Sequence, residues 1–280
     1  QANRYGILND KTIEINMKKA VNNKNEIVNR LTHGVGALLK ANDVDVVYGE
    51  ALLNSENVVE CNEQFYNVKS VILCGGSEAH RISIPGIDDE NVLTSDEILN
   101  LEEIPRRLII IGGGVIGCEI ATIFSWYGSE VVIIEAETRI LPQMDNEIAK
   151  ALEVVLQKRK VRIITSCTVK QVCRTGVDSI VICENGEKIQ GDKVLLSIGR
   201  TADLKCLGKM KDKITQERGK VSVNECLETN IAGIFAAGDI NGKCMLAHAA
   251  SKMGEVAARN ALGEKLSCDL RYVPNCVYTL

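Results

Sequence analysis

The stretch from Leu108 to Glu135 constrains the fold of this chain more than any other. It begins with an apolar run at 108–111, continues through the glycine-rich turn 112–117 into a helix-like segment, and ends with a second apolar run at 131–134 followed by Glu135. Strand, glycine turn, helix, strand and acid in this order form the full context of a dinucleotide-binding fingerprint. The stretch therefore predicts a Rossmann-like βαβ unit.

Each part of this fingerprint has an expected role. Gly112 allows the tight turn, Gly114 lets the backbone approach a pyrophosphate, and Gly117 lets the helix lie close to the strand. The amides of about Val115 to Cys118 are expected to face the phosphates, with the helix dipole behind them. Glu135 can accept both ribose hydroxyls and would repel a 2′-phosphate, which favours NAD over NADP. The alternative is a glycine turn without a ligand.

Composition narrows the class of protein. The 280 residues are enough for about two domains, and 45% are hydrophobic while only 4% are aromatic. A core of this kind is built mostly from Ile, Val and Leu, which suits buried parallel strands covered by helices. The net charge of −4 and the pI near 5.6 give no basic surface for nucleic acid or an acidic membrane. Small-molecule ligands are the default expectation.

The cysteines favour a reducing compartment. Eleven are scattered along the chain, largely within apolar runs as at Cys74, Cys118 and Cys183, and none forms a C-x-x-C or C-x-x-x-x-C pair. We therefore expect the cysteines to be buried thiols that bind no metal. No signal-peptide pattern is present at the N-terminus, and the most apolar stretch, 108–128, contains Glu119 and several glycines. We expect a cytoplasmic protein without a membrane span.

Hydrophobic periodicity predicts the remaining elements. Helices are expected at 26–41, in a short segment from Ser95, at 146–158 and at 246–262. Strands are expected at 44–48, 58–61, 68–74, 161–165, 169–173, 180–184, 193–198 and 234–237. The Asn185-Gly186 pair between apolar segments predicts a β-hairpin.

Two further glycine motifs end predicted strands, where open α/β sheets bind their ligands. Gly199 could let a nicotinamide approach, or it could be an ordinary loop glycine. Asp239, after Gly238, could accept hydrogen bonds from sugar hydroxyls or could be a turn residue. The amides of 245–248 open a helix and could form a second anion or carbonyl site. His248 by itself is more often a capping or packing residue than a base.

These residues together resemble the flavin-dependent disulfide reductases, and most closely the dihydrolipoamide dehydrogenases. The similar segments are 71–77, 108–141, 194–200, 229–239, 245–248 and 271–274. The resemblance implies that Asp239 holds the ribityl chain of FAD and that the helix start at 245–248 faces the flavin ring. It also implies an α/β fold in which a Rossmann-like NAD domain is inserted into a partial FAD-binding domain.

The expected boundaries are 1–96 for the first part of the FAD domain, 97–216 for the NAD domain, 217–268 for the second FAD part and 269–280 for the start of an interface domain.

The expected NAD residues are Gly112, Gly113, Gly114, Val115, Ile116, Gly117, Glu119, Glu135, Val169 and Gly199. The expected FAD residues are Gly75, Gly76, Ser77, Asp239, Met245, Leu246, Ala247 and His248.

The chain departs from the family in several places. The family's first FAD fingerprint, its C-x-x-x-x-C redox pair and its His-Glu base all lie outside this chain, so we expect an internal fragment without catalytic residues of its own. Cys74-Gly75 replaces the usual Ala-Thr with loss of a hydroxyl contact, and Ala202-Asp203 replaces Pro-Asn. Glu119 matches a glutamate that lies near flavin and nicotinamide and pairs with a lysine, which this chain lacks.

The function that the resemblance implies is that of an NAD-linked dihydrolipoamide dehydrogenase with a role in redox homeostasis. The expected partners are a second copy of the whole protein and the lipoyl domains of 2-oxoacid dehydrogenase, acetoin or glycine cleavage complexes. Alternatives are a related NADH oxidase or peroxidase, another disulfide reductase, or a stand-alone NAD-binding module. We expect the chain to hold NAD, to retain FAD weakly or not at all, and not to turn over alone.

Overall fold

The computed structural model describes residues 15–279, which divide into two compact units. The first unit runs to Asp43 and also contains Arg81–Ile198 and the residues from Tyr278 onward. The second contains Val44–His80 and Gly199–Val277. Each unit has its own hydrophobic core and is described separately.

The first unit is built on a five-stranded parallel sheet. Its strands, in spatial order, are β6 (Val92–Leu93), β13 (Lys193–Leu196), β7 (Arg107–Ile111), β8 (Glu130–Ile134) and β9 (Arg162–Ile164). Helix α3 (Val115–Trp126) connects β7 to β8, and α4 (Asn146–Lys158) connects β8 to β9. Parallel neighbours need such crossovers. The aliphatic side chains of β7, β8 and β13 are almost fully buried, and the predicted Rossmann-like fold is confirmed.

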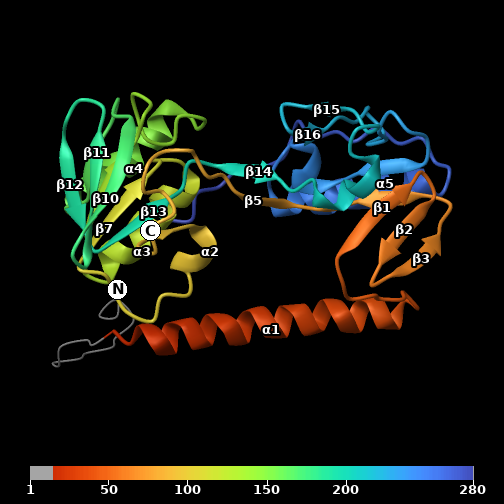
Figure 1. The fold of residues 1–280 in the computed structure, drawn as a ribbon, viewed down its shortest axis with the longest axis horizontal. Helices are drawn as coiled ribbons and strands as arrows, with labels where there is room; N and C mark the ends of the chain where they lie inside the picture. The colour runs from red at the N-terminus through yellow and green to blue at the C-terminus, as the bar shows by residue number, and fades with distance from the viewer. Residues whose placement is uncertain (1–14, 280) are drawn as a thin grey trace. The chain divides into compact units, whose positions relative to one another are not determined.

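An antiparallel meander packs on this sheet. It consists of β10 (Val169–Thr175), β11 (Asp178–Cys183) and β12 (Lys188–Gly191). The predicted Asn185-Gly186 hairpin joins β11 to β12, with Gly186 at φ +85° and the Asn185 side chain accepting from the Glu187 amide at 2.9 Å. One core cluster contains aliphatic residues of both sheets, which lie side by side in Figure 1.

The second unit contains short strands from distant parts of the chain. Strands β1 (Ala51–Ser55), β2 (Val58–Cys61) and β3 (Gln64–Asn67) form an antiparallel meander. Strand β4 (Val71–Leu73) pairs in parallel with β17 (Ile234–Ala236), and β5 (Ser77–Ala79) pairs antiparallel with β14 (Arg200–Ala202). The remaining elements are β15 (Gln216–Glu217), β16 (Lys220–Val221), the 3-10 helices η2 (Lys205–Met210) and η3 (Gly238–Asn241), and α5 (Ala247–Ala261).

The two units do not divide where the expected domain boundaries lie. The segment 81–96 carries β6, which pairs with β13 inside the parallel sheet and leads into α2 (Ser95–Ile98). The segment 199–216 carries β14, which pairs with β5 in the second unit. Strands as short as these leave no periodic signal, so boundaries predicted at 96 and 216 fall later in the sequence than those of the compact units.

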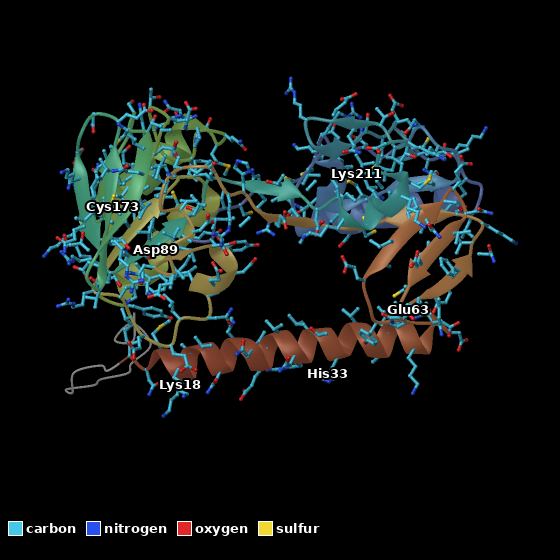
Figure 2. The ribbon with its side chains drawn as sticks, viewed as in Figure 1. Lys18, His33, Glu63, Asp89, Cys173 and Lys211 are labelled. Carbon is cyan, nitrogen blue, oxygen red and sulfur yellow. The ribbon has the colours of Figure 1, made fainter. Side chains whose placement is uncertain are left out.

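Helix α1 (Met17–Ala41) begins earlier than the predicted 26–41. The Asn16 side chain accepts a hydrogen bond from the Lys19 amide, and this N-cap allows the helix to start there. Figure 2 shows side chains along the helix, with Lys18 near its start and His33 beyond its middle. Apolar residues beyond its first turns are exposed, including Leu31 at 66% and Val35 at 58%.

The strand predicted at 44–48 is absent. These residues are exposed and have no regular secondary structure, while β1 begins only at Ala51. A β-strand persists when a neighbouring strand satisfies its amides and carbonyls. Residues 44–48 pair with no strand of the described chain, so their Val-rich composition alone does not produce one.

Candidate functional site

The glycine loop after β7 is packed so tightly that side chains are excluded at two positions. Gly112 has φ +103°, and a Cβ atom there would lie 2.5 Å from the Ser197 carbonyl oxygen. A Cβ at Gly117 would lie 2.1 Å from the Gly112 carbonyl oxygen. Gly114 differs, because no described atom lies within 4 Å of its Cβ position. The turn and the close approach of helix and loop are therefore present, with open space beside Gly114.

Helix α3 presents its amino-terminal amides at this loop. Gly114 is the N-cap and supplies no side-chain hydrogen bond. The Cys118 amide donates to the Gly114 carbonyl at 3.0 Å, so it is already used within the helix. The expectation that Cys118 also faces a phosphate is wrong for this reason. The amides of Val115, Ile116 and Gly117 precede that first helical bond and have no acceptor in their own helix.

Glu135 directly follows β8 and is only 7% exposed. Its Oε2 accepts from the Gly113 amide at 2.6 Å, and its Oε1 accepts from the Glu137 amide at 2.8 Å. A carboxylate has about four acceptor positions, so each oxygen keeps capacity for one ribose hydroxyl. The acid of the fingerprint is thus bonded directly to its glycine loop.

Cys118 fills the space behind the loop. Its Sγ lies 3.3 Å from the Gly113 carbonyl oxygen. Burial, followed by the nearby carboxylates of Glu135 and Glu119, raises the pKa of this thiol to about 12. The thiolate is the reactive form of cysteine, so Cys118 is an inert packing residue at neutral pH. Cys74, in contrast, directly follows β4 and is exposed, so the expected burial fails there.

Three other expected NAD residues lie in different settings. The Glu119 Oε1 accepts from the Tyr278 amide at 2.8 Å, a contact that the sequence pattern did not predict. Val169 begins β10, and its side chain lies in the hydrophobic core. Gly199 is exposed, has φ +122° and is the first residue of the second unit.

In the second unit, three distant segments bring together the polar group around Asp239. The Ser77 hydroxyl donates to Asp239 Oδ2 at 2.6 Å. Arg200 donates from Nε to the Ser77 hydroxyl at 2.7 Å and from Nη2 to the Ser77 carbonyl at 2.6 Å. The roles of Ser77 and Asp239 were expected from the sequence, whereas that of Arg200 was not. Its only sequence signal is its place after Gly199 at a strand end.

Gly75 and Gly76 form the turn that leads into β5. A Cβ at Gly75 would lie 2.7 Å from the Asp203 carbonyl oxygen, and Gly76 has φ +73°. The Asp203 amide donates to the Gly76 carbonyl at 3.0 Å. This turn therefore needs glycine for packing and conformation, as well as for any approach of a ligand.

The segment Met245–His248 leads into α5, whose N-cap is Leu246 and has no side-chain hydrogen bond. The amides at the helix start therefore have no capping side chain. His248 is exposed, and its Nε2 lies 2.9 Å from the Pro274 carbonyl oxygen. The His248 side chain is thus engaged with backbone of the same unit.

Residues 15–279 contain no group of three or more His, Cys, Asp or Glu side chains placed to hold a metal ion. No helix in this part of the chain is long and apolar enough to cross a membrane.

Most of this chain matches a family of known proteins. The pyridine nucleotide-disulphide oxidoreductase family matches residues 4–254. The chain belongs to that family. The family is one of oxidoreductases, and its members use FAD and NAD(H).

Similar proteins include several dihydrolipoyl dehydrogenases. That of Acholeplasma laidlawii is 37% identical over 92% of this chain and 77% of its own length. That of Mycoplasma pneumoniae is 33% identical over 99% of this chain and 62% of its own length. The chain thus spans less than two thirds of the latter enzyme.

Two solved structures resemble the fold of this chain. LpdA of Mycobacterium tuberculosis has a TM-score of 0.88 at 26% identity, covering 95% of this chain and 61% of its own. The HOCl-induced flavoprotein disulfide reductase RclA of Escherichia coli has a TM-score of 0.83 at 28% identity, covering 91% and 59%.

Proposed function

We propose that this chain carries the NAD(H) site of a dihydrolipoyl dehydrogenase and part of its FAD site. The observation that carries the proposal is the Gly112–Gly117 loop, which excludes side chains at Gly112 and Gly117 and is bonded to the buried carboxylate of Glu135. The amides of Val115 to Gly117 would hold the pyrophosphate, and Glu135 would accept the adenosine ribose hydroxyls.

The same carboxylate supports a preference for NAD over NADP. Glu135 is buried, and its two carboxylate oxygens accept hydrogen bonds from the backbone amides of Gly113 and Glu137. A 2′-phosphate would meet this negative charge where water screens it little.

The Asp239 group supports the FAD assignment. Ser77 and Arg200 orient the carboxylate of Asp239 by direct and relayed hydrogen bonds, so that it can accept from ribityl hydroxyls. Bound flavin would supply hydride exchange with the nicotinamide and two-electron exchange with a disulfide. The chain's own residues in this group bind and orient, and none of them transfers a proton or an electron.

The reaction proposed for the whole protein is oxidation of dihydrolipoamide with reduction of NAD. The support is the 33–37% identity to two dihydrolipoyl dehydrogenases. The second candidate is another flavoprotein disulfide reductase, as the likeness to RclA suggests. We propose lipoyl domains of 2-oxoacid dehydrogenase, acetoin or glycine cleavage complexes as partners, a homodimer as the assembly, and the cytoplasm as the location.

The test is a titration of the purified chain with NADH and NADPH, followed by nicotinamide fluorescence. We expect saturable NADH binding and at least about tenfold weaker NADPH binding, since one charged contact changes affinity by that order. Equal affinity for both, or none for NADH, would overturn the proposed site. Because this chain has no C-x-x-x-x-C pair, dihydrolipoamide oxidation by the chain alone is expected to be absent.

A further inference from the structure

Ser197 lies directly behind the glycine loop. It follows β13 and is only 7% exposed. Its amide donates to the Ile111 carbonyl at 2.8 Å. Its hydroxyl lies 3.1 Å from the Ile111 carbonyl oxygen and 3.0 Å from the Gly112 carbonyl oxygen. Carbonyl oxygens only accept, so the single proton of the serine hydroxyl is shared between these two oxygens.

Ser197 also contacts the glycines that shape the loop. A Cβ at Gly117 would lie 2.9 Å from the Ser197 hydroxyl oxygen, and one at Gly112 would lie 2.5 Å from the Ser197 carbonyl oxygen. The serine therefore occupies the point where strand β13, the loop and helix α3 meet. Its small side chain fits there, and its hydroxyl is directed at the loop backbone.

The peptide unit between Gly112 and Gly113 is held at both ends. Its carbonyl oxygen accepts from the Ser197 hydroxyl at 3.0 Å, and its N–H donates to Glu135 Oε2 at 2.6 Å. A peptide unit is planar, so fixing the carbonyl direction also fixes the N–H direction. Loss of the hydroxyl of Ser197 would free this plane to rotate and would loosen the anchor of Glu135.

We propose that Ser197 is a positioning residue for the dinucleotide, acting through the Gly112–Gly113 peptide on Glu135. The proposal rests on the NAD(H) function proposed above. Ser197 touches neither pyrophosphate nor ribose in this role. It keeps the loop turned so that its amides face the pyrophosphate, and it keeps the carboxylate of Glu135 in place for the ribose.

The chain offers a matched control in Ser179. This serine lies on β11 in the same unit, is fully buried, and its hydroxyl has no hydrogen-bond partner among the described residues. Ser197→Ala and Ser179→Ala thus delete the same atom from two buried sites. Only the first deletion removes a hydrogen bond to the glycine loop.

The experiment measures NADH affinity by fluorescence for the wild-type chain, Ser197→Ala, Ser179→Ala, Glu135→Ala and the double variant Ser197→Ala/Glu135→Ala. We expect Ser197→Ala to weaken NADH binding roughly fivefold, the effect of one buried hydrogen bond, and Ser179→Ala to leave it unchanged. In the Glu135→Ala background, the loss of NADH affinity caused by Ser197→Ala should be less than half as large as in the wild-type chain. The reason is that the effects of coupled residues are not additive. A purely structural serine would lower the thermal midpoint without this coupling.

Two results overturn the inference. The first is an NADH affinity of Ser197→Ala equal to that of Ser179→Ala. The second is full additivity with Glu135→Ala. If Ser197→Ala fails to fold, Ser197→Cys takes its place, because the thiol keeps a weaker hydrogen-bond donor. Its NADH affinity is expected to lie between that of the wild-type chain and complete loss of binding. Failure of the wild-type chain to bind NADH would instead reject the proposed function, and the inference with it.

Discussion

The carboxylate of Glu135 is joined to the backbone amide of Gly113 by a hydrogen bond of 2.6 Å. Two parts of the fingerprint that are separated by a helix and a strand thus share one contact. The carboxylate proposed to bind the ribose also holds, through the Gly113 amide, the loop proposed to bind the pyrophosphate. At the proposed NAD(H) site, recognition of the ribose and of the pyrophosphate would therefore depend on each other.

Glu135→Ala is expected to weaken NADH binding by at least about tenfold, because a charged hydrogen-bond acceptor is lost. NADPH binding should weaken less, since repulsion of its 2′-phosphate is also removed. The measurement is a pair of fluorescence titrations. Glu137→Ala serves as the control, because this neighbouring carboxylate is exposed and only its backbone amide contacts Glu135. An unchanged ratio of the two affinities would contradict the ribose role.

Gly117→Ala and Gly114→Ala should have different effects. A methyl group at Gly117 would lie 2.1 Å from the Gly112 carbonyl oxygen, so overpacking should destabilise the fold by about 1–3 kcal/mol and abolish NADH binding. Gly114 has φ −72° and open space at its Cβ position, so its alanine variant should keep the wild-type thermal midpoint. It should nevertheless bind NADH less tightly, since the methyl would occupy space facing the pyrophosphate. Calorimetry and titration separate the two effects.

Stability should fall in alkali because of Cys118. Burial raises the pKa of its thiol from 9.0 to about 12, so between these values the unfolded chain loses a proton that the folded chain keeps. The stabilisation is complete below about pH 9 and is lost as the pH rises towards about 12, at about 1.4 kcal/mol per pH unit for one group. Unfolding followed across this range should show a shallower decline for Cys118→Ala. Cys276→Ala, which removes an exposed thiol instead of a buried one, is the comparison.

The purified chain is expected to be colourless. FAD binding normally relies on a glycine loop and helix dipole for its pyrophosphate, and this chain contains one complete G-x-G-x-x-G, at 112–117. Asp239, which accepts from Ser77, would in the proposed role hold only the ribityl chain and not the pyrophosphate. Absorbance after purification, and dialysis against added FAD, would check this. A stoichiometric flavin band would contradict it.

The exposed side chains of α1 should promote association without contributing to folding. Leu31 and Val35 are 66% and 58% exposed, and exposed apolar surface favours self-association. Replacing both with Gln should lower concentration-dependent light scattering and leave the thermal midpoint unchanged. Val21→Gln is the comparison, since Val21 lies on the same helix but is buried, and it should lower the midpoint.

The sequence predicted the central βαβ unit well because its signals are local. Runs of buried aliphatic residues predicted β7 and β8, and helix α4 was predicted at its observed bounds. The Asn185-Gly186 turn predicted the β11–β12 hairpin. In each case the hydrophobic pattern and the turn residues favour the same structure that tertiary packing requires.

Features that depend on distant contacts could not be predicted in this way. Strand β6 exists because β13 pairs with it, and 44–48 is not a strand because no partner meets it. The roles of Arg200 and Ser197 arise from hydrogen bonds to Ser77 and Gly112, which are far away in sequence. Single polar residues at strand ends carry no periodic signal that would indicate such partners.

The peptide clamped between Ser197 and Glu135 has a consequence for any exchange of cofactor preference. A substitution at position 135 that accommodates a 2′-phosphate would also remove the acceptor of the Gly113 amide and so loosen the loop proposed to bind the pyrophosphate. Selection for NADP along such a path would first pass through a protein that binds both cofactors poorly. A change of preference would therefore need a second, compensating substitution behind the loop, and Ser197 marks where that substitution would act.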